Sequence, residues 1–531
     1  MRLFAAALAA TTLIAAPALA KDKSKSITPY VDAGQVLVAD LSGGGEVLTY
    51  STVGAGIDAS IQTRRVEVQL SYKYERRFDW QNDVADQDTH SGLARAAVKV
   101  APGFTVEGGA LATRARSDIR GDAPTNLAGN VRNVSQVYSV YGGPTFHTGN
   151  GPASVSAAYR FGYTKVEAPT ISSIDPAAPA VDVFDSSTNH LAQVRAGVKA
   201  GTILPVGLSV AGAWQREEMS QLDQKFDGKY GRVDAVLPIS RGLAVVGGVG
   251  YEKIEITQKD ALRDGTGAIV RDGAGRFVTD PASPPRIAYE IEGIFWDAGV
   301  LYKPNARLML EARAGRRYDS MSYTGSLQWQ ISRRSGLQVG VYDSVQSFGR
   351  QLASDLAALP TSFNVPTDSF GDQFDGCIFG DSGTAAGGCL TNALGSVASA
   401  NYRARGVTGV LAMNSGRTTL GLGAGYANRR YLVPAGSSVL AGSSDDTYYA
   451  QLFASRALNG RSGVNGNMFV NYYQSSIAGA PGVFGGGAAG SYYHNFGPLS
   501  AVASVGISSF EVDGEGSNTQ AQAQLGLRYG F

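Results

Sequence analysis

The sequence is poor in charge, histidine and cysteine. Asp, Glu, Lys and Arg make up 17% of its 531 residues, and a net charge of +1 gives no reason to expect a nucleic acid or another polyanion as partner. The four histidines are scattered, and the two cysteines have no further Cys or His nearby to complete a metal site. We therefore expect no bound metal, no cofactor and no nucleic-acid partner.

Catalytic motifs are also scarce. Gly380-Asp381-Ser382-Gly383 matches four residues around the nucleophile of chymotrypsin-like proteases, but that mechanism also needs a His base and a buried Asp in a two-barrel soluble fold. Gly421-x-Gly423-x-Gly425 is not followed by the Lys-Ser/Thr of a phosphate loop, so we interpret its glycines as bending a strand or making room in the lumen. We expect no catalytic residue and no enzyme activity.

Long apolar runs are missing beyond the N-terminus. Arg2 precedes an apolar stretch from Leu3 to Ala16, and Ala18-Leu19-Ala20 is an A-x-A cleavage site. We interpret residues 1–20 as a cleaved signal peptide, which leaves residues 21–531 as an exported chain. No later segment approaches the roughly 18 consecutive apolar residues of a membrane helix.

The mature sequence consists instead of segments in which apolar and polar residues alternate. In Val66–Glu75 the apolar residues occupy every second position, and Met321–Ile331 repeats the pattern. A period of two indicates β-strands with one apolar and one polar face. The sequence has 68 Gly and 25 Tyr residues, and Gly is interleaved with Tyr, Val, Leu and Ala in these segments, which argues against disorder.

The connections between these segments alternate between short turns and long polar stretches. Short periplasmic turns and long extracellular loops are typical of outer-membrane barrels. We predict an all-β fold: a single closed antiparallel transmembrane β-barrel of about 22 strands (20–24), from Ile27–Ala39 to Thr519–Phe531. Two extracellular loops should be especially long, over about 258–286 and 349–400.

The C-terminal strand carries the clearest family signal. Ala521–Phe531 alternates throughout and ends on Tyr529 and Phe531, which resembles the terminal strand that the barrel-insertion machinery of Gram-negative bacteria reads. Ile27–Val36 and Tyr74-Glu75-Arg76-Arg77 look like porin-like outer-membrane barrels of alphaproteobacteria such as sphingomonads. The resemblance implies a location in the outer membrane, with outer-membrane lipid, lipopolysaccharide and the insertion machinery as partners.

A strand number near 22 also resembles that of TonB-dependent transporters. Those proteins carry an N-terminal plug of well over a hundred residues, whereas here the first strand is expected near Ile27. We therefore expect no N-terminal plug and no energised transport. A barrel this wide would otherwise leave an aqueous channel.

Charged residues on the polar faces should line the lumen. In one interpretation they are a structural lining. In the other they are a selectivity surface, in which basic clusters such as Arg313, Arg317 and Arg429 attract anionic solutes. The candidates are Glu67, Lys73, Arg95, Lys99, Arg160, Arg195, Asp234, Glu311, Arg313, Arg317, Arg429 and Arg528.

The long loop over 349–400 holds both cysteines. In an exported protein Cys377 and Cys389 are expected to form a disulfide. A loop of this length is uncommon unless it is functional or disordered, so we expect it to cap or enter the barrel mouth. The predicted function is a pore or export conduit for small solutes or a polysaccharide. The alternative is a structural or interaction barrel whose extracellular loops do the work.

Overall fold

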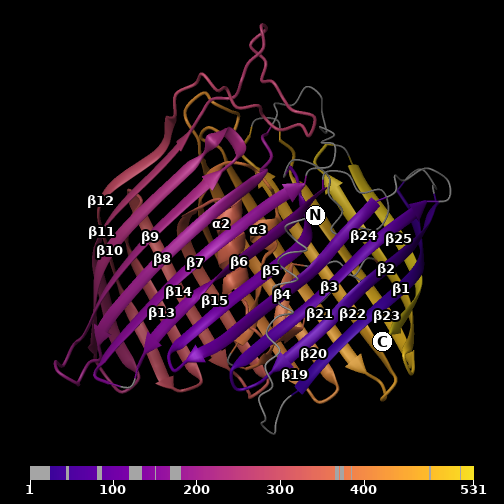
Figure 1. The fold of residues 1–531 in the computed structure, drawn as a ribbon, viewed down its shortest axis with the longest axis horizontal. Coiled ribbons are helices and arrows are strands. Elements are labelled where there is room, and N and C mark those ends of the chain that lie inside the picture. The colour runs from indigo at the N-terminus through magenta and orange to yellow at the C-terminus, as the bar shows by residue number, and fades with distance from the viewer. Residues whose placement is uncertain are drawn as a thin grey trace.

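A computed structural model describes residues 24–42, 47–79, 87–118, 134–149, 151–167, 181–364, 370, 376–383, 385–477, 480–514 and 516–531. Within them, 22 strands form one antiparallel sheet. Strand β1 pairs with β2 on one side and with β25, the last strand, on the other. The sheet is therefore a ring in which every strand has two hydrogen-bonded neighbours (Figure 1).

The expected number of strands is confirmed. Two segments that alternate poorly in sequence, near 401–413 and 483–493, are strands of the ring. The strands are β1 Ser24–Asp40, β2 Val47–Gln62, β3 Val66–Asp79, β4 Gln87–Ala101, β5 Phe104–Arg116, β6 Val134–Thr148, β7 Ala153–Glu167, β8 Ser186–Val198, β9 Gly207–Met219, β10 Lys225–Pro238, β11 Leu243–Gln258, β12 Arg286–Asn305, β13 Leu308–Arg317, β14 Ser320–Gln330, β15 Ser335–Gln346, β19 Asn401–Ser415, β20 Thr418–Leu432, β21 Ser444–Ala457, β22 Ser462–Ser475, β23 Val483–Phe496, β24 Leu499–Val512 and β25 Gly516–Gly530.

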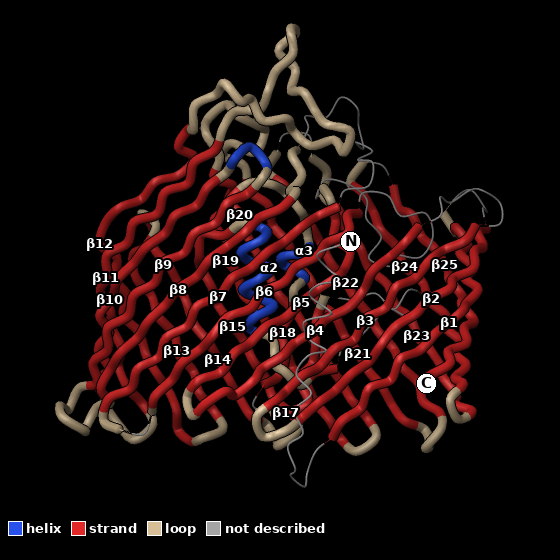
Figure 2. Tube along the Cα trace, in the orientation of Figure 1, coloured by secondary structure: helices blue, strands red, loops and turns tan. Residues whose placement is uncertain are grey.

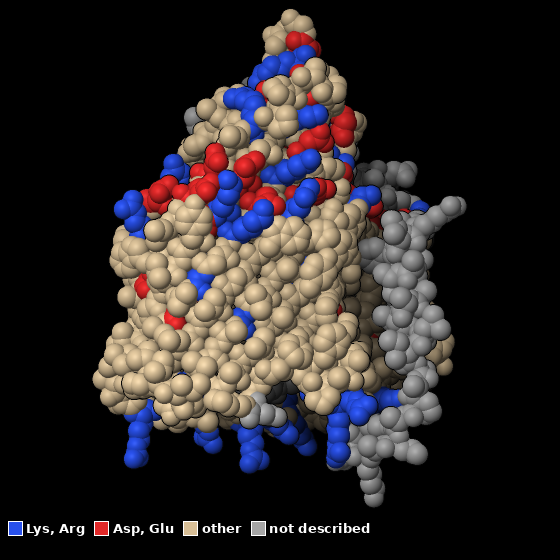
Figure 3. All heavy atoms as spheres, turned by 60° about the vertical axis from the view of Figure 1, so that its left-hand side comes forward, with Lys and Arg blue, Asp and Glu red and all other residues tan. Residues whose placement is uncertain are grey.

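Sequence alternation decides which side chains face outward. On β25 Leu525 is 70% exposed and Leu527 is 55% exposed, whereas Gln522 is only 4% exposed. Successive side chains of a strand point to opposite faces, so the apolar set forms the outer surface and the polar set points inward. The space-filling view shows the result as a broad band almost free of charge, bounded above and below by charged residues (Figure 3).

The connections are sorted by edge, as Figure 2 shows. One edge carries ten short connections, such as 63–65 between β2 and β3 and 416–417 between β19 and β20. We call it the turn edge, and the opposite edge, which carries the long connections, the loop edge. Two connections at the loop edge are also short, 318–319 between β13 and β14 and 513–515 between β24 and β25.

The segment 349–400 is more structured than the sequence pattern predicts. It contains helices α2 Phe348–Ala358 and α3 Thr391–Leu394 and a small sheet of β16 Phe363–Asn364, β17 Cys377–Ser382 and β18 Ala385–Cys389. Alternation of apolar and polar residues reveals long strands, but it does not reveal a short helix or strands of two to six residues, which explains the difference. No helix among the described residues is long and apolar enough to cross a membrane.

The other long loop, 258–286, contains an eight-residue repeat that was not predicted from the sequence. Asp264 and Asp272 each accept two backbone N–H groups in matching turns. Leu262, Val270 and Val278 are joined in a triangle of backbone hydrogen bonds of 2.8–3.0 Å. At the preceding position of each repeat, Ala261, Ile269 and Phe277 pack on Leu222 of the 3-10 helix η1 Gln221–Asp223. The loop is therefore a compact, folded knob at the loop edge.

Candidate functional site

We call the connection between β15 and β19, residues 347–400, the insertion, and those of its residues that the structure describes lie inside the ring. In Figure 2 its helices lie inside the ring, behind the front strands. Helix α2 contacts β5, β6, β7 and β8 on one wall, while β17 and β18 contact β19 and β15 on another. The insertion therefore bridges different walls of the ring and occupies part of its interior.

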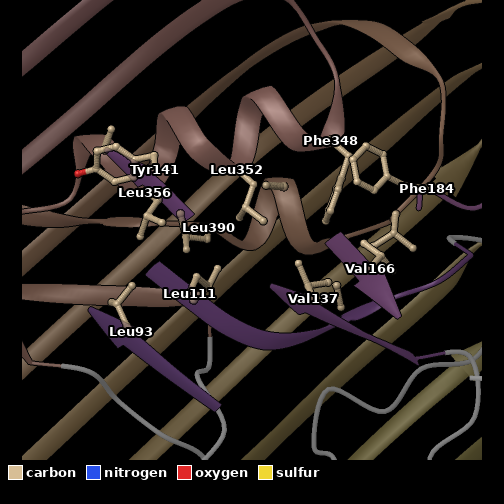
Figure 4. Close-up of a cluster of buried hydrophobic side chains, with 14 of the residues drawn as sticks. Leu93, Leu111, Val137, Tyr141, Val166, Phe184, Phe348, Leu352, Leu356 and Leu390 are labelled. Carbon is tan, nitrogen blue, oxygen red and sulfur yellow. The ribbon is translucent and has the colours of Figure 1, made fainter. Parts of the chain in front are cut away.

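An apolar face holds α2 on the wall. Phe348, Leu352 and Leu356 repeat at every fourth position, which places them on one side of a helix. Leu352 and Leu356 are fully buried against wall residues such as Leu111 and Val137 (Figure 4). Burying such a side chain contributes about 1.5–3 kcal/mol, so this contact alone holds the helix firmly in place.

A buried ion pair anchors the N-terminal end of α2. The Arg350 guanidinium lies 3.0 Å from the Glu217 carboxylate of β9, and both side chains are fully buried. Arg350 also donates to Asn401 at 2.9 Å, and Ser347 donates to Glu217 at 2.6 Å while capping the helix. A buried charge without these partners would be costly, so the network fixes where α2 begins relative to β9 and β19.

Two carboxyl groups, one in the insertion and one beside it, have raised pKa values. Burial raises the pKa of Asp355, on α2, to about 7, although the Gln351 side chain donates to it. Burial also raises the pKa of Asp182 to about 6, against hydrogen bonds that favour its charged form. Asp182 accepts from Phe277 N and Gln221 Nε2 in the knob region and from Ser399 Oγ in the insertion, so it ties the two together.

The second half of the insertion reaches the turn edge. Cys377 and Cys389 face each other across β17 and β18, with their sulfur atoms 2.08 Å apart in a disulfide. At the hairpin's other end, Gly383 N donates to Arg333 O in the turn between β14 and β15 at 3.1 Å. Because the insertion leaves β15 and enters β19 at the loop edge, it spans the interior from one edge to the other.

Glycines of β20 make room for this hairpin. A Cβ on Gly423 would lie 2.5 Å from Cys377 Sγ, and one on Gly421 would lie 2.5 Å from the Phe379 ring. Both positions accept only a residue without a side chain unless the hairpin moves. The Gly421-x-Gly423 spacing is therefore a packing signature of the insertion.

The remaining stretch of the insertion crosses to the walls around β1 and β3. Thr361 donates to Glu67 at 2.6 Å, and the Gln69 side chain bonds both the N–H and the C=O of Phe363. Phe370 packs with Val36, Val38 and Tyr50 and lies under Gly506 of β24. Arg95 donates to the carbonyls of Ala357 and Leu359, which closes the C-terminal end of α2.

Residues of β6 to β10, β13 and β14 line a cavity of about 600 Å³. Arg232 lies 2.6 Å from Asp234 and 2.9 Å from Asp297, and Arg313 lies 3.0 Å from Asp234, 2.8 Å from Asp297 and 2.5 Å from Glu311. Arg160 pairs with Glu107 at 2.9 Å, and the more exposed Arg195 lies 3.8 Å from Asp234. Arg195, Arg232 and Arg313 thus form one charge network with Asp234, Asp297 and Glu311, and the Arg160–Glu107 pair lies beside it.

The other expected lining residues lie apart from this network. Lys73 pairs with Asp32 and Glu75 at 2.9 Å, and Arg528 reaches the same Asp32 at 3.2 Å. Lys99 is exposed near the turn edge. The C-terminal residues Tyr529 and Phe531 are 44% and 73% exposed on the outer surface.

The structure gives different partners to the three arginines that the sequence analysis grouped, which are Arg313, Arg317 and Arg429. Arg317 pairs with Glu252 at 2.7 Å, and Arg429 is buried under the insertion, where it reaches Ser396 O at 3.5 Å. The three do not form one basic cluster, because β20 lies four strands from β13 in the ring.

Sequence reasoning missed Arg350, Asp182 and Asp355. The four-residue spacing of Phe348, Leu352 and Leu356 could have indicated the helix that carries Arg350. Among the residues that the structure describes, no group of three or more His, Cys, Asp and Glu side chains could hold a metal ion.

Comparison with known proteins gives only distant matches. No family model and no curated protein matches the sequence. Among solved structures, the ferric-catecholate import receptor Fiu of E. coli K12 is 11% identical over 94% of this chain and 81% of its own, with a TM-score of 0.43. The FrpB iron transporter of Neisseria meningitidis is 10% identical over 95% and 81%, and the siderophore receptor PiuA of Acinetobacter baumannii is 8% identical over 97% and 82%; both give a TM-score of 0.43. At these values we carry neither iron transport nor any other activity over to this chain.

Proposed function

We propose that this chain is an outer-membrane β-barrel through which small polar solutes pass, and that the insertion narrows the passage. The observation that carries the proposal is the course of the described residues of the insertion, which run from the loop edge to the turn edge inside the ring and pack on several walls. A ring of 22 strands would otherwise enclose a wide aqueous channel.

The outer surface supports placement in a membrane. In addition to the apolar band, the outer surface carries three histidines in aromatic groups. In each group a tyrosine hydroxyl lies within hydrogen-bond distance of a histidine ring nitrogen. The pairs are Tyr72–His90 at 2.7 Å, Tyr159–His190 at 2.8 Å and Tyr492–His494 at 3.3 Å. Amphipathic aromatic side chains of this kind favour the interface between lipid and water.

The charge network favours polar solutes of either sign. Arg160, Arg195, Arg232 and Arg313 are balanced by the carboxylates of Glu107, Asp234, Asp297 and Glu311. Such a wall offers hydrogen bonds to any hydrophilic molecule and has no net charge that would exclude cations or anions. An insertion that fills part of the lumen favours small solutes over a polysaccharide.

A swelling assay with vesicles that contain the purified protein tests the proposal. We expect glucose to enter at a rate well above that of protein-free vesicles, and a large dextran to be excluded. Entry of the dextran would favour the polysaccharide conduit. Exclusion of every solute, with the protein correctly inserted, would contradict the pore and favour the second function.

The second candidate is an interaction barrel, and the knob over 258–286 favours it. A loop that folds on its own repeat and is tied by Asp182 to the insertion presents a fixed surface outside the membrane. Replacing residues 262–279 by a short Gly-Ser linker should leave glucose entry unchanged if the knob serves only recognition.

A further inference from the structure

The short connections of the turn edge carry basic residues only, and Glu67, at an adjoining strand end, accepts a hydrogen bond from Thr361 of the insertion. The ten short connections contain no Asp or Glu at all. Their basic residues are Arg64, Arg65, Lys199, Arg241, Arg307, Arg333, Arg334, Arg417 and Arg461, and Lys99, Lys303 and Arg456 lie at the adjoining strand ends. In a chain whose net charge is only +1, this asymmetry places the balancing acids elsewhere.

These basic side chains are exposed and lack carboxylate partners. All twelve belong to the exposed class, and none of them forms a salt bridge with any residue that the structure describes. Figure 3 shows basic side chains projecting below the apolar band, whereas at the opposite edge basic and acidic residues intermingle. There, outward-facing charges are paired, as in Arg216–Glu218 at 2.6 Å and Lys253–Glu292 at 2.7 Å.

Apolar side chains lie exposed in the same turns. Ile203 is 68% exposed, Ile239 is 58% exposed and Leu458 is 46% exposed. A soluble acidic partner would match the basic groups alone. A bilayer surface matches both, because its hydrocarbon boundary accepts the apolar side chains while its headgroups meet the cations.

We propose that the turn edge is a binding surface for anionic phospholipids, whose phosphates and net negative charge it recognises in the leaflet on that side. The inference rests on the proposed placement of the barrel in a membrane. Arginine binds phosphate oxygens through paired N–H groups, and each Lys or Arg near an anionic bilayer surface contributes about 1 kcal/mol. That energy corresponds to about fivefold enrichment of anionic lipid per basic side chain.

Trp329 is a natural reporter of the lipid next to this edge. It is the penultimate residue of β14, lies four positions before Arg333 and is 46% exposed on the outer surface. A variant that keeps only this tryptophan, with Trp80, Trp214 and Trp296 changed to Phe, would be reconstituted into symmetric vesicles. The vesicles contain brominated phosphatidylglycerol or brominated phosphatidylcholine, which quench tryptophan on contact.

We expect the quenching to give a relative binding constant of about five or more in favour of phosphatidylglycerol at low salt. The preference should fall toward one at high salt and in the Arg333→Gln/Arg334→Gln variant. Arg263→Gln/Arg271→Gln removes the same charge from the knob at the loop edge and should leave the preference unchanged. A variant that keeps only Trp296, which pairs with Arg316 toward the loop edge, should show a smaller preference.

The outcomes separate the two proposals. Equal quenching of Trp329 by both lipids would overturn the lipid-binding surface while leaving the membrane barrel standing, and an acidic soluble partner would then be the better interpretation of the turn edge. No quenching by either lipid would overturn the placement in a membrane, and the lipid-binding surface with it.

Discussion

Removing the apolar contact of α2 should release the insertion without unfolding the ring. Leu352 and Leu356 are fully buried between the helix and the wall. Truncating a buried leucine to alanine costs about 2–5 kcal/mol, because the lost burial is added to the cost of the cavity that remains. The Leu352→Ala/Leu356→Ala variant should therefore weaken docking of α2 by at least about 4 kcal/mol.

Amide hydrogen exchange measures this loss directly. A change of about 4 kcal/mol corresponds to about a thousandfold increase in the undocked fraction, so protection of the α2 amides should fall by that factor. Amides in β20 to β25 should keep their protection, because the ring hydrogen bonds are untouched. Ser354→Ala, on the exposed side of the same helix, is the matched control and should change little.

Uniform loss of protection across ring and insertion would refute this reasoning. It would mean that the ring depends on the insertion for its stability, and that 347–400 is part of the fold rather than an element docked inside it. Unchanged α2 protection in the double variant would instead show that the Arg350–Glu217 pair alone holds the helix.

Three further changes probe other parts of the structure. Leu327→Arg should destabilise the protein by about 1–3 kcal/mol in a urea titration. The loss should be smaller than for an arginine at the bilayer midplane, because Leu327 lies three residues from the end of β14. Gln328→Arg, on the inward face, should change the stability little. The pKa of Asp355 is about 7 when α2 is docked and lower when α2 is undocked. Docking of α2 should therefore weaken as the pH rises from about 4 to about 7 and stay constant at higher pH. The Asp355→Asn variant should show no such pH dependence in the hydrogen exchange of the α2 amides. Gly423→Val should displace the disulfide hairpin and raise vesicle permeability, whereas Gly231→Val, where a Cβ meets nothing within 4 Å, should not.

The ring could be predicted from the sequence because its physical rule is local. An apolar outer surface and a polar interior impose a period of two on each strand, and β25 shows this period in its own residues. The number of strands followed from the sorted turns. The repeat over 258–286 was not predicted, because it stabilises one loop through turn geometry and shows no alternation of apolar and polar residues.

The interior could be predicted only in part. Alternation identified Arg313, Asp234 and Glu67 as inward-facing, but which groups pair depends on register and on neighbouring strands. The partner of Glu217 is Arg350, 133 positions later in a segment with no strand pattern, and only folding brings the two together. The interpretation of Arg313, Arg317 and Arg429 as one basic cluster was wrong for the same reason.

Single-channel conductance of the chain without residues Thr361–Thr391 tests the central claim most directly. The deletion removes the disulfide hairpin and its approach while leaving every strand of the ring intact. If the insertion narrows a passage, the deletion variant should insert into planar bilayers and conduct in larger steps than the full chain under the same salt. Equal conductance of the two proteins, both folded and inserted, would show that the insertion does not limit the passage and would contradict the account.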